Sequence, residues 1–193
     1  MLGKKYEFKP DKDGSGTLHK LFITRKQRLS LLKWVLFGVM LVLLSLVQDV
    51  IMCQIRIFGS TTDLVGVSIL LICMLLEVDS SAVFAITAST LFFLSGSAPG
   101  PYTIVFLTVL GVILNIFRHA FLHRNAITLL LSAAVGMMVY VLLVFILGLF
   151  LGHTTLERFG VFCMNGLLSI AVMPILYPIF LSISKIGGST WKE

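Results

Sequence analysis

Long apolar runs separated by short polar segments dominate the chain. Apolar and polar positions do not alternate: residues 135–147 form an unbroken series of Val, Gly, Met, Tyr, Leu, Phe and Ile. Alternation is typical of membrane β-barrel strands, whereas a membrane-spanning helix needs about 20 consecutive apolar residues. The pattern therefore predicts an all-α membrane protein with about six helices. Their approximate ranges are 31–52, 64–76, 82–94, 102–117, 126–151 and 160–183.

The second and third predicted helices are shorter than the others. Each has an apolar core of 13 residues, or ~20 Å of helix at 1.5 Å per residue. This length is less than the ~30 Å thickness of the hydrocarbon layer. Two arrangements fit: a pair of short helices buried among the other spans, or a re-entrant hairpin.

Composition agrees with a membrane location and leaves no room for a soluble domain. Hydrophobic residues make up 58% of the chain and charged residues 12%, and the mean hydropathy is +1.02. The charged fraction is about half that of a typical soluble domain. We expect a polar basic arm over 1–28, a single transmembrane helical domain over 29–185, and a short tail over 186–193.

Basic residues are concentrated before the first apolar run. Nine of the fifteen Lys and Arg residues fall within the first 33 positions. With a cytoplasmic N-terminus, six helices place thirteen of the fifteen on the cytoplasmic side, as the positive-inside rule favours. Five helices would leave the lysines of the tail outside and weaken this bias. The sequence predicts a multi-pass cell-membrane protein with both termini cytoplasmic, whose basic arm faces membrane lipids and binds no nucleic acid.

The cysteine and histidine residues do not form a catalytic or metal-binding pattern. Cys53, Cys73 and Cys163 are isolated in apolar sequence and are expected to be small buried hydrophobic residues. His119 and His123 share a helix face, but no third metal ligand accompanies them. We therefore expect no enzymatic activity, no metal and no cofactor.

The acidic residues lie at the ends of the predicted helices. Asp49, Asp63, Glu77 and Asp79 are expected to be interfacial, because a carboxylate at the membrane centre is costly. Glu77 and Asp79 are the best candidates for a buried pair, since the short hairpin could sit below the surface. Asp63 or Thr62 could cap the helix that follows.

Small residues on the fifth predicted helix indicate close helix packing. Gly148 and Gly152 form a G-x-x-x-G pair, and Ser132 and Gly136 form a second small-x-x-x-small pair. Such pairs let two helices approach closely. The approaching helix could belong to this chain or to a partner.

Polar and helix-breaking residues mark further positions. Gly96 and Gly100 lie in a Ser-Gly-Ser-Ala-Pro-Gly-Pro turn over 95–101. Pro174 and Pro178 are expected to kink the last helix, which could then line a pocket. Asn115 and Asn165, which lie within predicted apolar helices, could form hydrogen bonds between helices.

Three segments of the chain resemble one family. They are Leu94-Ser95-Gly96-Ser97-Ala98-Pro99-Gly100, followed by an apolar span and a basic stretch ending Arg124-Asn125; Asn165 followed by Pro174-Ile175-Leu176-Tyr177-Pro178; and Thr62-Asp63-Leu64. Over residues 30–185 the chain resembles the rod shape-determining membrane protein MreD family. Where that family has an acid before the Ser-Gly turn, this chain has Phe92 and Phe93.

The resemblance implies a non-enzymatic scaffold of the bacterial cell-elongation complex. Members bind MreC and, through it, work with MreB, RodA and a penicillin-binding transpeptidase in lateral peptidoglycan synthesis. We expect the single transmembrane helix of MreC to contact the small-residue faces formed by Ser132, Gly136, Gly148 and Gly152.

The family is also similar in fold to the substrate-binding subunits of energy-coupling-factor vitamin transporters. The alternative function is therefore that of a vitamin-binding subunit. Its ligand pocket would lie near the outer face, with Asn165, Gln48 and Asp49 as polar groups and Tyr177 deeper in the membrane.

Overall fold

The computed structural model describes residues 25–52, 54–55, 57–121 and 125–186, and this part of the chain is all-helical. The all-α prediction is thus confirmed. The helices are α2 (Arg25–Val47), α3 (Leu64–Leu75), α4 (Val78–Leu94), α5 (Tyr102–Phe121), α6 (Ala126–Phe150) and α7 (Phe159–Ser184), with a π-helical turn η2 (Gln48–Met52) and a 3₁₀ turn η3 (Leu156–Arg158).

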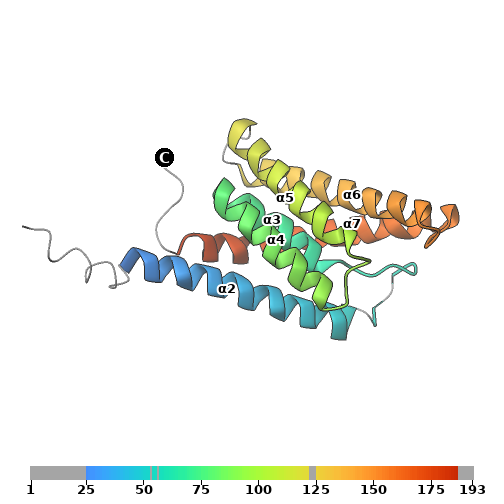
Figure 1. The fold of residues 1–193 in the computed structure, drawn as a ribbon, viewed down its shortest axis with the longest axis horizontal. Helices are drawn as coiled ribbons and strands as arrows, with labels where there is room; N and C mark the ends of the chain where they lie inside the picture. The colour runs from blue at the N-terminus through green and yellow to red at the C-terminus, as the bar shows by residue number, and fades with distance from the viewer. Residues whose placement is uncertain (1–24, 53, 56, 122–124, 187–193) are drawn as a thin grey trace, which may run out of the picture.

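Consecutive helices run in opposite directions along one axis (Figure 1). The turn η2 and the connections 57–63, 95–101 and 151–158 lie together at one end of the bundle, which we name the loop end. The first residues of α2 and the last residues of α7 lie at the opposite end, which we name the terminal end. Both described ends of the chain are therefore on the same side of the bundle.

Four helical segments are long and apolar enough to cross a membrane. They are Arg28–Met52, Tyr102–Ala120, Ala126–Phe150 and Leu156–Ser184. The helices α3 and α4 have 12 and 17 residues, which corresponds to ~18 and ~26 Å. The predicted shortness of this helix pair is confirmed, although α4 is longer than its apolar core indicated.

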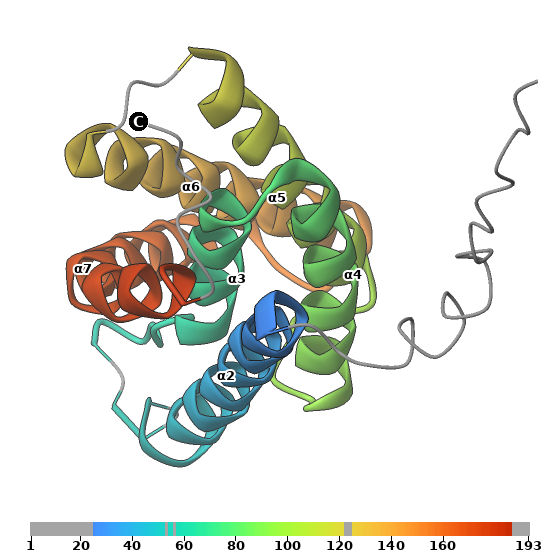
Figure 2. The same ribbon diagram turned by 90° about the vertical axis from the view of Figure 1, so that its left-hand side faces the viewer.

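The short helix α3 lies at the centre of the bundle (Figure 2). All twelve of its residues are buried, and it contacts α2, α4, α5, α6 and α7. A helix that is hydrophobic all round is expected in such a position. By contrast, α4 presents Val83, Ile86 and Leu91 outward. The buried arrangement considered for the short pair therefore holds in full for α3 and on one face of α4.

Several helix boundaries differ from the predicted ranges. The helix α4 starts at Val78 instead of 82, because Glu77 has the extended backbone of an N-cap and Asp79 lies in the first turn, where the helix dipole favours an acid. The helix α5 continues to Phe121 and carries Arg118 and His119 in its last turn, where the dipole favours cations. The helix α2 begins at Arg25, inside the range predicted as the polar arm; positions 1–24 of that arm lie outside the described residues.

The predicted turn glycines lie in the connection between α4 and α5, and the predicted kink prolines lie within α7. Gly96 has a φ of +80° in the α4–α5 turn, a conformation that glycine adopts at little cost. At Gly100 an added Cβ would lie 2.4 Å from the ring of Tyr102, so the turn is tightly packed. Pro174 and Pro178 both lie inside α7.

The burial of α3 generates a prediction for stability. Changing Ile72 in α3 to Ala should lower the free energy of unfolding by about 2 kcal/mol or more, because the cavity is enclosed on all sides. Ile72→Ala is measured against Val135→Ala, at a position of α6 that is 60% exposed, by denaturant unfolding of the full-length protein in a defined micelle. Equal losses for both variants would contradict the central position of α3.

Candidate functional site

Polar side chains converge where α3 begins, at the loop end of the bundle. They come from η2, from the 57–63 connection and from α7. We name Gln48, Ser60, Asp63, Asn165 and Ser169 the loop-end cluster. The first turn of a buried helix has backbone N–H groups without intrahelical partners, and the cluster lies around this turn.

The helix α7 supplies one side of the loop-end cluster. The Asn165 side-chain amide donates to the carbonyl oxygen of Thr61 at 2.6 Å. The backbone N–H of Asp63 donates to the Ser169 hydroxyl at 2.9 Å. The Ser60 hydroxyl donates to the Val161 carbonyl at 3.0 Å. These bonds fasten the 57–63 connection to a helix about a hundred residues later in the chain.

Two side chains satisfy the free N–H groups of α3. Asp63 is the N-cap, and its carboxylate accepts from the N–H of Gly66 at 2.8 Å. Gln48 reaches across from η2, and its amide oxygen accepts from the N–H of Val65 at 2.9 Å. The predicted cap is thus confirmed at Asp63.

Asp63 lies in the connection before α3, outside the membrane-spanning helices, and is buried. Burial raises the pKa of its carboxyl group from 3.8 to about 6, and the bond from Gly66 opposes this shift. Tyr140 of α6 lies near Asp63 and Thr103, and the buried hydroxyls of Tyr140 and Thr103 lack a hydrogen bond of standard geometry. Because loss of solvation outweighs the bond from Gly66, the surroundings favour the protonated form of Asp63 more than water does.

Asp49 lies apart from these buried contacts. Its carboxylate is exposed and accepts a hydrogen bond from the Ser97 hydroxyl in the α4–α5 turn. It lines an apolar slot between α2 and α4, to which neither Gln48 nor Asn165 contributes. Tyr177 is half-buried and packs against the core. Of the polar groups considered for a vitamin pocket, only Asp49 lines this slot.

The terminal end of α3 is held by Asn115 of α5. Its side-chain amide donates to the carbonyls of Cys73 and Leu76, at 2.7 and 3.2 Å. These carbonyls belong to the last turn of α3, which has no intrahelical donors for them. The expectation of hydrogen bonds between helices is confirmed for Asn115, which bonds from α5 to the end of α3. Asn165 instead bonds from α7 to the 57–63 connection, at Thr61.

Glu77 and Asp79 do not form the buried pair that was considered as the alternative to interfacial positions. Glu77 and Asp79 are both exposed at the start of α4, because α4 begins four residues earlier than its apolar core and lifts both carboxylates to the surface. Their exposure agrees with the interfacial position expected of all four acids, whereas Asp63 is buried.

The first small-residue pair of α6 faces the interior of the bundle. A Cβ added at Gly136 would lie 2.3 Å from a methyl carbon of Leu114 in α5. The Ser132 hydroxyl donates to the Leu129 carbonyl at 2.9 Å and lies 3.8 Å from the Met74 sulfur of α3. This pair therefore packs α6 against α5 and α3. Of the two possibilities considered, the approaching helices belong to this chain and not to a partner.

The second pair ends α6. The Gly148 carbonyl accepts from the N–H groups of His153 and Thr154, at 2.9 and 3.3 Å. Gly152 follows the helix end with a φ of +71°, the conformation of a C-terminal glycine cap. Gly148 therefore lies inside α6, and Gly152 lies beyond its end. The two glycines do not form the single helix face that the expected contact with a partner helix requires.

The cysteine and histidine side chains are dispersed in the described part of the chain. Cys73 is buried, Cys163 is half-buried and His119 is exposed. Cys53 and His123 lie outside the described residues. The described residues contain no group of three or more His, Cys, Asp and Glu side chains that could hold a metal ion.

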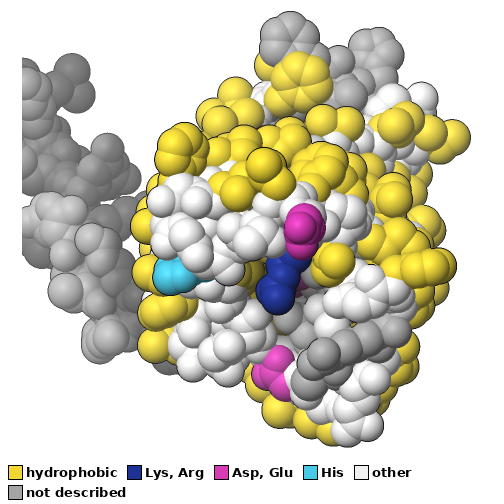
Figure 3. All heavy atoms as spheres, turned by 90° about the vertical axis from the view of Figure 1, so that its right-hand side faces the viewer, with side chains coloured by type: hydrophobic (Ala, Val, Ile, Leu, Met, Phe, Trp, Pro, Cys, Tyr) yellow, Lys and Arg dark blue, Asp and Glu magenta, His cyan; other side chains and the backbone are white. Residues whose placement is uncertain are grey.

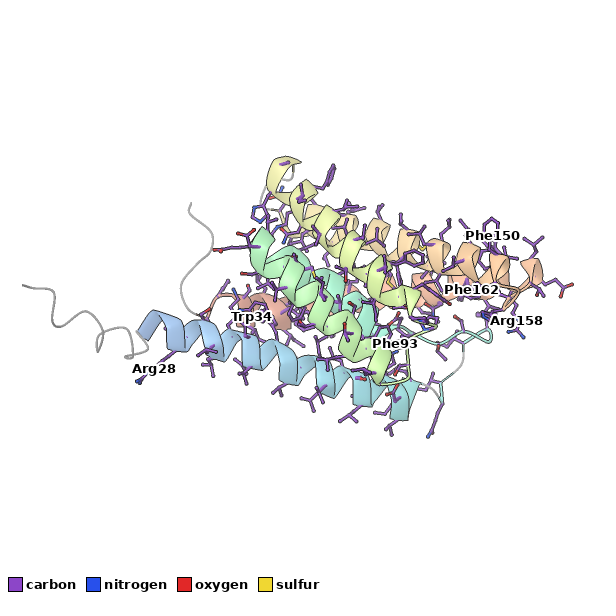
Figure 4. The ribbon with its side chains drawn as sticks, in the orientation of Figure 1. Arg28, Trp34, Phe93, Phe150, Arg158 and Phe162 are labelled. Carbon is purple, nitrogen blue, oxygen red and sulfur yellow. The ribbon has the colours of Figure 1, made fainter. Side chains whose placement is uncertain are left out.

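The surface of the loop end carries few charges. Figure 3 shows one basic region near acidic side chains, with hydrophobic side chains around the rim. Arg158 lies at this end, whereas Arg28 lies at the terminal end (Figure 4). Among the exposed hydrophobic residues are Phe58 and Phe150.

Sequence reasoning missed Ser169, Ser60 and Tyr140 in this region. Ser169 follows Asn165 by four positions and so lies on the same face of α7. This spacing could have predicted that the two side chains act together. Ser60 and Tyr140 gave no comparable signal, because their positions depend on contacts between distant segments.

Comparisons of the chain with protein-family models, curated proteins and solved structures find no match. The assignment of function therefore depends on the residues of this chain and their contacts.

Burial of Asp63 predicts that stability depends on pH. Because its pKa is raised to about 6 in the folded state, its contribution is fully present below pH ~4 and is lost as pH rises through ~6, by up to about 3 kcal/mol. Unfolding free energies of the full-length protein between pH 4 and 7 test this. Asp63→Asn keeps an acceptor for Gly66 and should flatten the profile; an unchanged profile would contradict the assignment.

The bond from Asn165 to Thr61 predicts a loss of stability on substitution. Asn165→Leu removes the donor and should cost about 0.5–2 kcal/mol, the range for hydrogen bonds between membrane helices. Ser182→Ala is the control, because the Ser182 hydroxyl bonds only within its own helix, to Pro178. Thermal unfolding of both variants should separate them, and equal midpoints would show that the bond is dispensable.

Proposed function

We propose that the protein is an integral membrane scaffold of the bacterial cell-elongation complex, which binds MreC and supports cell shape and lateral peptidoglycan synthesis. The proposal is supported most by the meeting of two segments that carry the resemblance to the MreD family. Thr62-Asp63-Leu64 and Asn165 are about a hundred residues apart, and the Asn165 amide donates to the carbonyl of Thr61, which directly precedes Thr62. The third segment adds the bond from Ser97 to Asp49.

The proposed topology has six spans with both termini in the cytoplasm. The α3–α4 pair would complete the count, with α3 shielded from lipid by the other helices. Among the basic residues whose side chains the structure describes, Arg28, Lys33, Arg118 and Lys185 belong to the terminal half of the bundle. Arg158 lies at the loop end. This asymmetry favours a cytoplasmic terminal end. The proposal includes the family's similarity in fold to energy-coupling-factor substrate-binding subunits.

The scaffold would act through its lipid-facing surface. Only 11% of the most apolar stretch of α2 and η2 is buried, against 44% in α6, so α2 is the least enclosed of the long helices. Its outward face presents Val35, Val39 and Leu43. We place the transmembrane helix of MreC on this face, where van der Waals packing would hold it, and MreB, RodA and the penicillin-binding transpeptidase would join through MreC.

The alternative function, a vitamin-binding transport subunit, requires free polar groups around a ligand. Gln48 and Asn165 are already bonded to backbone groups that fix α3 and the 57–63 connection. They would have to release these groups to bind a vitamin. The scaffold proposal requires no such rearrangement.

Gentle purification of the tagged full-length protein from its native membranes tests the proposal. We expect MreC and cell-wall synthesis proteins to be recovered with it. Recovery of a pair of transport ATPases and their membrane coupling subunit would replace the scaffold with the transport function.

Substitution on α2 locates the contact. Leu43→Trp should reduce the recovery of MreC, because the larger side chain would disturb helix packing on this face. Ile113→Trp on α5 is the matched control, since Leu43 and Ile113 are 50% and 54% exposed. Equal recovery from both variants would exclude this face of α2 without excluding the scaffold function.

A further inference from the structure

An apolar slot of about 440 Å³ separates the loop-end half of α2 from α4. We name it the α2–α4 slot. Its floor is made by the buried side chains Leu41, Val65, Ala88 and Phe92. Its rim is made by exposed apolar side chains, among them Leu46 and Leu91. The slot therefore opens sideways, toward the lipid in a membrane.

Contacts on both sides of the slot hold the two helices in place. Toward the terminal end, the rings of Trp34 and Phe37 lie 5.9 and 6.1 Å from the ring of Phe84 in α4. At the loop end, Ser97 donates to Asp49. Between these contacts, α2 presents Ser45 and α4 presents Ala88 to the slot. Small side chains thus leave space where larger ones would bring the helices into contact.

The lining of the slot suits a hydrocarbon chain. The lining residues of α2 and η2 extend from Leu41 to Asp49, which corresponds to ~12 Å. Apart from Ser45, Asp49 and Ser95, every lining side chain is apolar. A hydrocarbon chain that lies along the slot therefore contacts apolar side chains and has no polar group to leave unpaired.

The loop end of the slot is polar and carries a negative charge. The Ser95 and Ser97 hydroxyls lie 3.1 Å apart, and Ser97 donates to the exposed carboxylate of Asp49. Asp49 and Ser95 both line the slot. A carboxylate has further lone pairs and accepts only, so it complements a cationic donor and repels an anionic group.

We propose that the α2–α4 slot binds one acyl chain of an amine-bearing phospholipid, phosphatidylethanolamine, with the headgroup ammonium on Asp49. The apolar floor receives the chain, and Asp49 selects the headgroup by charge. The bound lipid fills the space left by Ser45 and Ala88. This proposal is independent of the proposed function, since it concerns the lipid that surrounds the protein.

Native mass spectrometry of the full-length protein tests the slot. The protein is equilibrated in micelles containing equal amounts of phosphatidylethanolamine and phosphatidylglycerol with identical acyl chains. We expect one tightly retained phosphatidylethanolamine. Ala88→Leu and Ser45→Leu each fill the slot from one wall and should abolish this retention, whereas Val135→Leu, on the exposed face of α6, should preserve it. Retention by folded Ala88→Leu and Ser45→Leu proteins would overturn the proposal.

Headgroup selection is tested separately. Asp49→Asn should lower the preference for phosphatidylethanolamine by about tenfold, the factor expected for one charge-assisted hydrogen bond. Glu157→Gln is the control, because Glu157 is an exposed acid of η3 at the same end of the bundle. Equal retention of the two lipids by the unaltered protein would overturn the proposal.

A photocrosslinking residue at Leu91, on the slot rim, identifies the occupant in native membranes. Labelling of phosphatidylethanolamine supports the proposal, and labelling of a polypeptide instead of lipid overturns it. This experiment changes no buried residue of the slot. Its result therefore does not depend on whether the Ala88→Leu and Ser45→Leu variants fold.

Discussion

The burial of α3 is the constraint on which the rest of the structure depends. A helix has unpaired N–H groups at its start and unpaired carbonyls at its end, and a helix enclosed by protein on all sides cannot pair them with bulk water. Here Asp63 and Gln48 bond to the first turn, and Asn115 bonds to the last. Gln48, Asp63 and Asn115 thus each supply a partner that the ends of this one helix of twelve residues lack.

These polar contacts also determine what the surface can offer. Asn165, which the sequence offered as a polar group for a vitamin pocket, instead bonds to the 57–63 connection, as Ser169 does. The same holds for Ser132 and Gly136, whose small size brings α6 close to α5 and α3. The outward-facing surface is then mostly apolar, and association with lipid or with another helix is the chemistry that it supports best.

The positions of the helices could be predicted from the sequence because hydrophobic runs of this length have few alternatives. The central place of α3 was also accessible, since residues 64–75 are apolar on every face. The start of α4 was missed because Asp79 and Ser80 are polar, although both are compatible with a first helical turn. The roles of Gly148 and Gly152 were not predictable from spacing, because a G-x-x-x-G pair looks the same whether it lies along a helix or straddles its end. The proximity of Tyr140 to Asp63 arises from packing between segments and left no local signal.

The long-range bond from Asn165 to Thr61 has a consequence for biogenesis. The chain enters the membrane from its N-terminus, so α3 emerges before the α7 residues that secure its first turn have been synthesised. Until then the 57–63 connection lacks the acceptor at Ser169 and the donor at Asn165. The native enclosure of α3 is therefore completed only after insertion of the last helix, and the earlier helices must remain adjustable until it arrives.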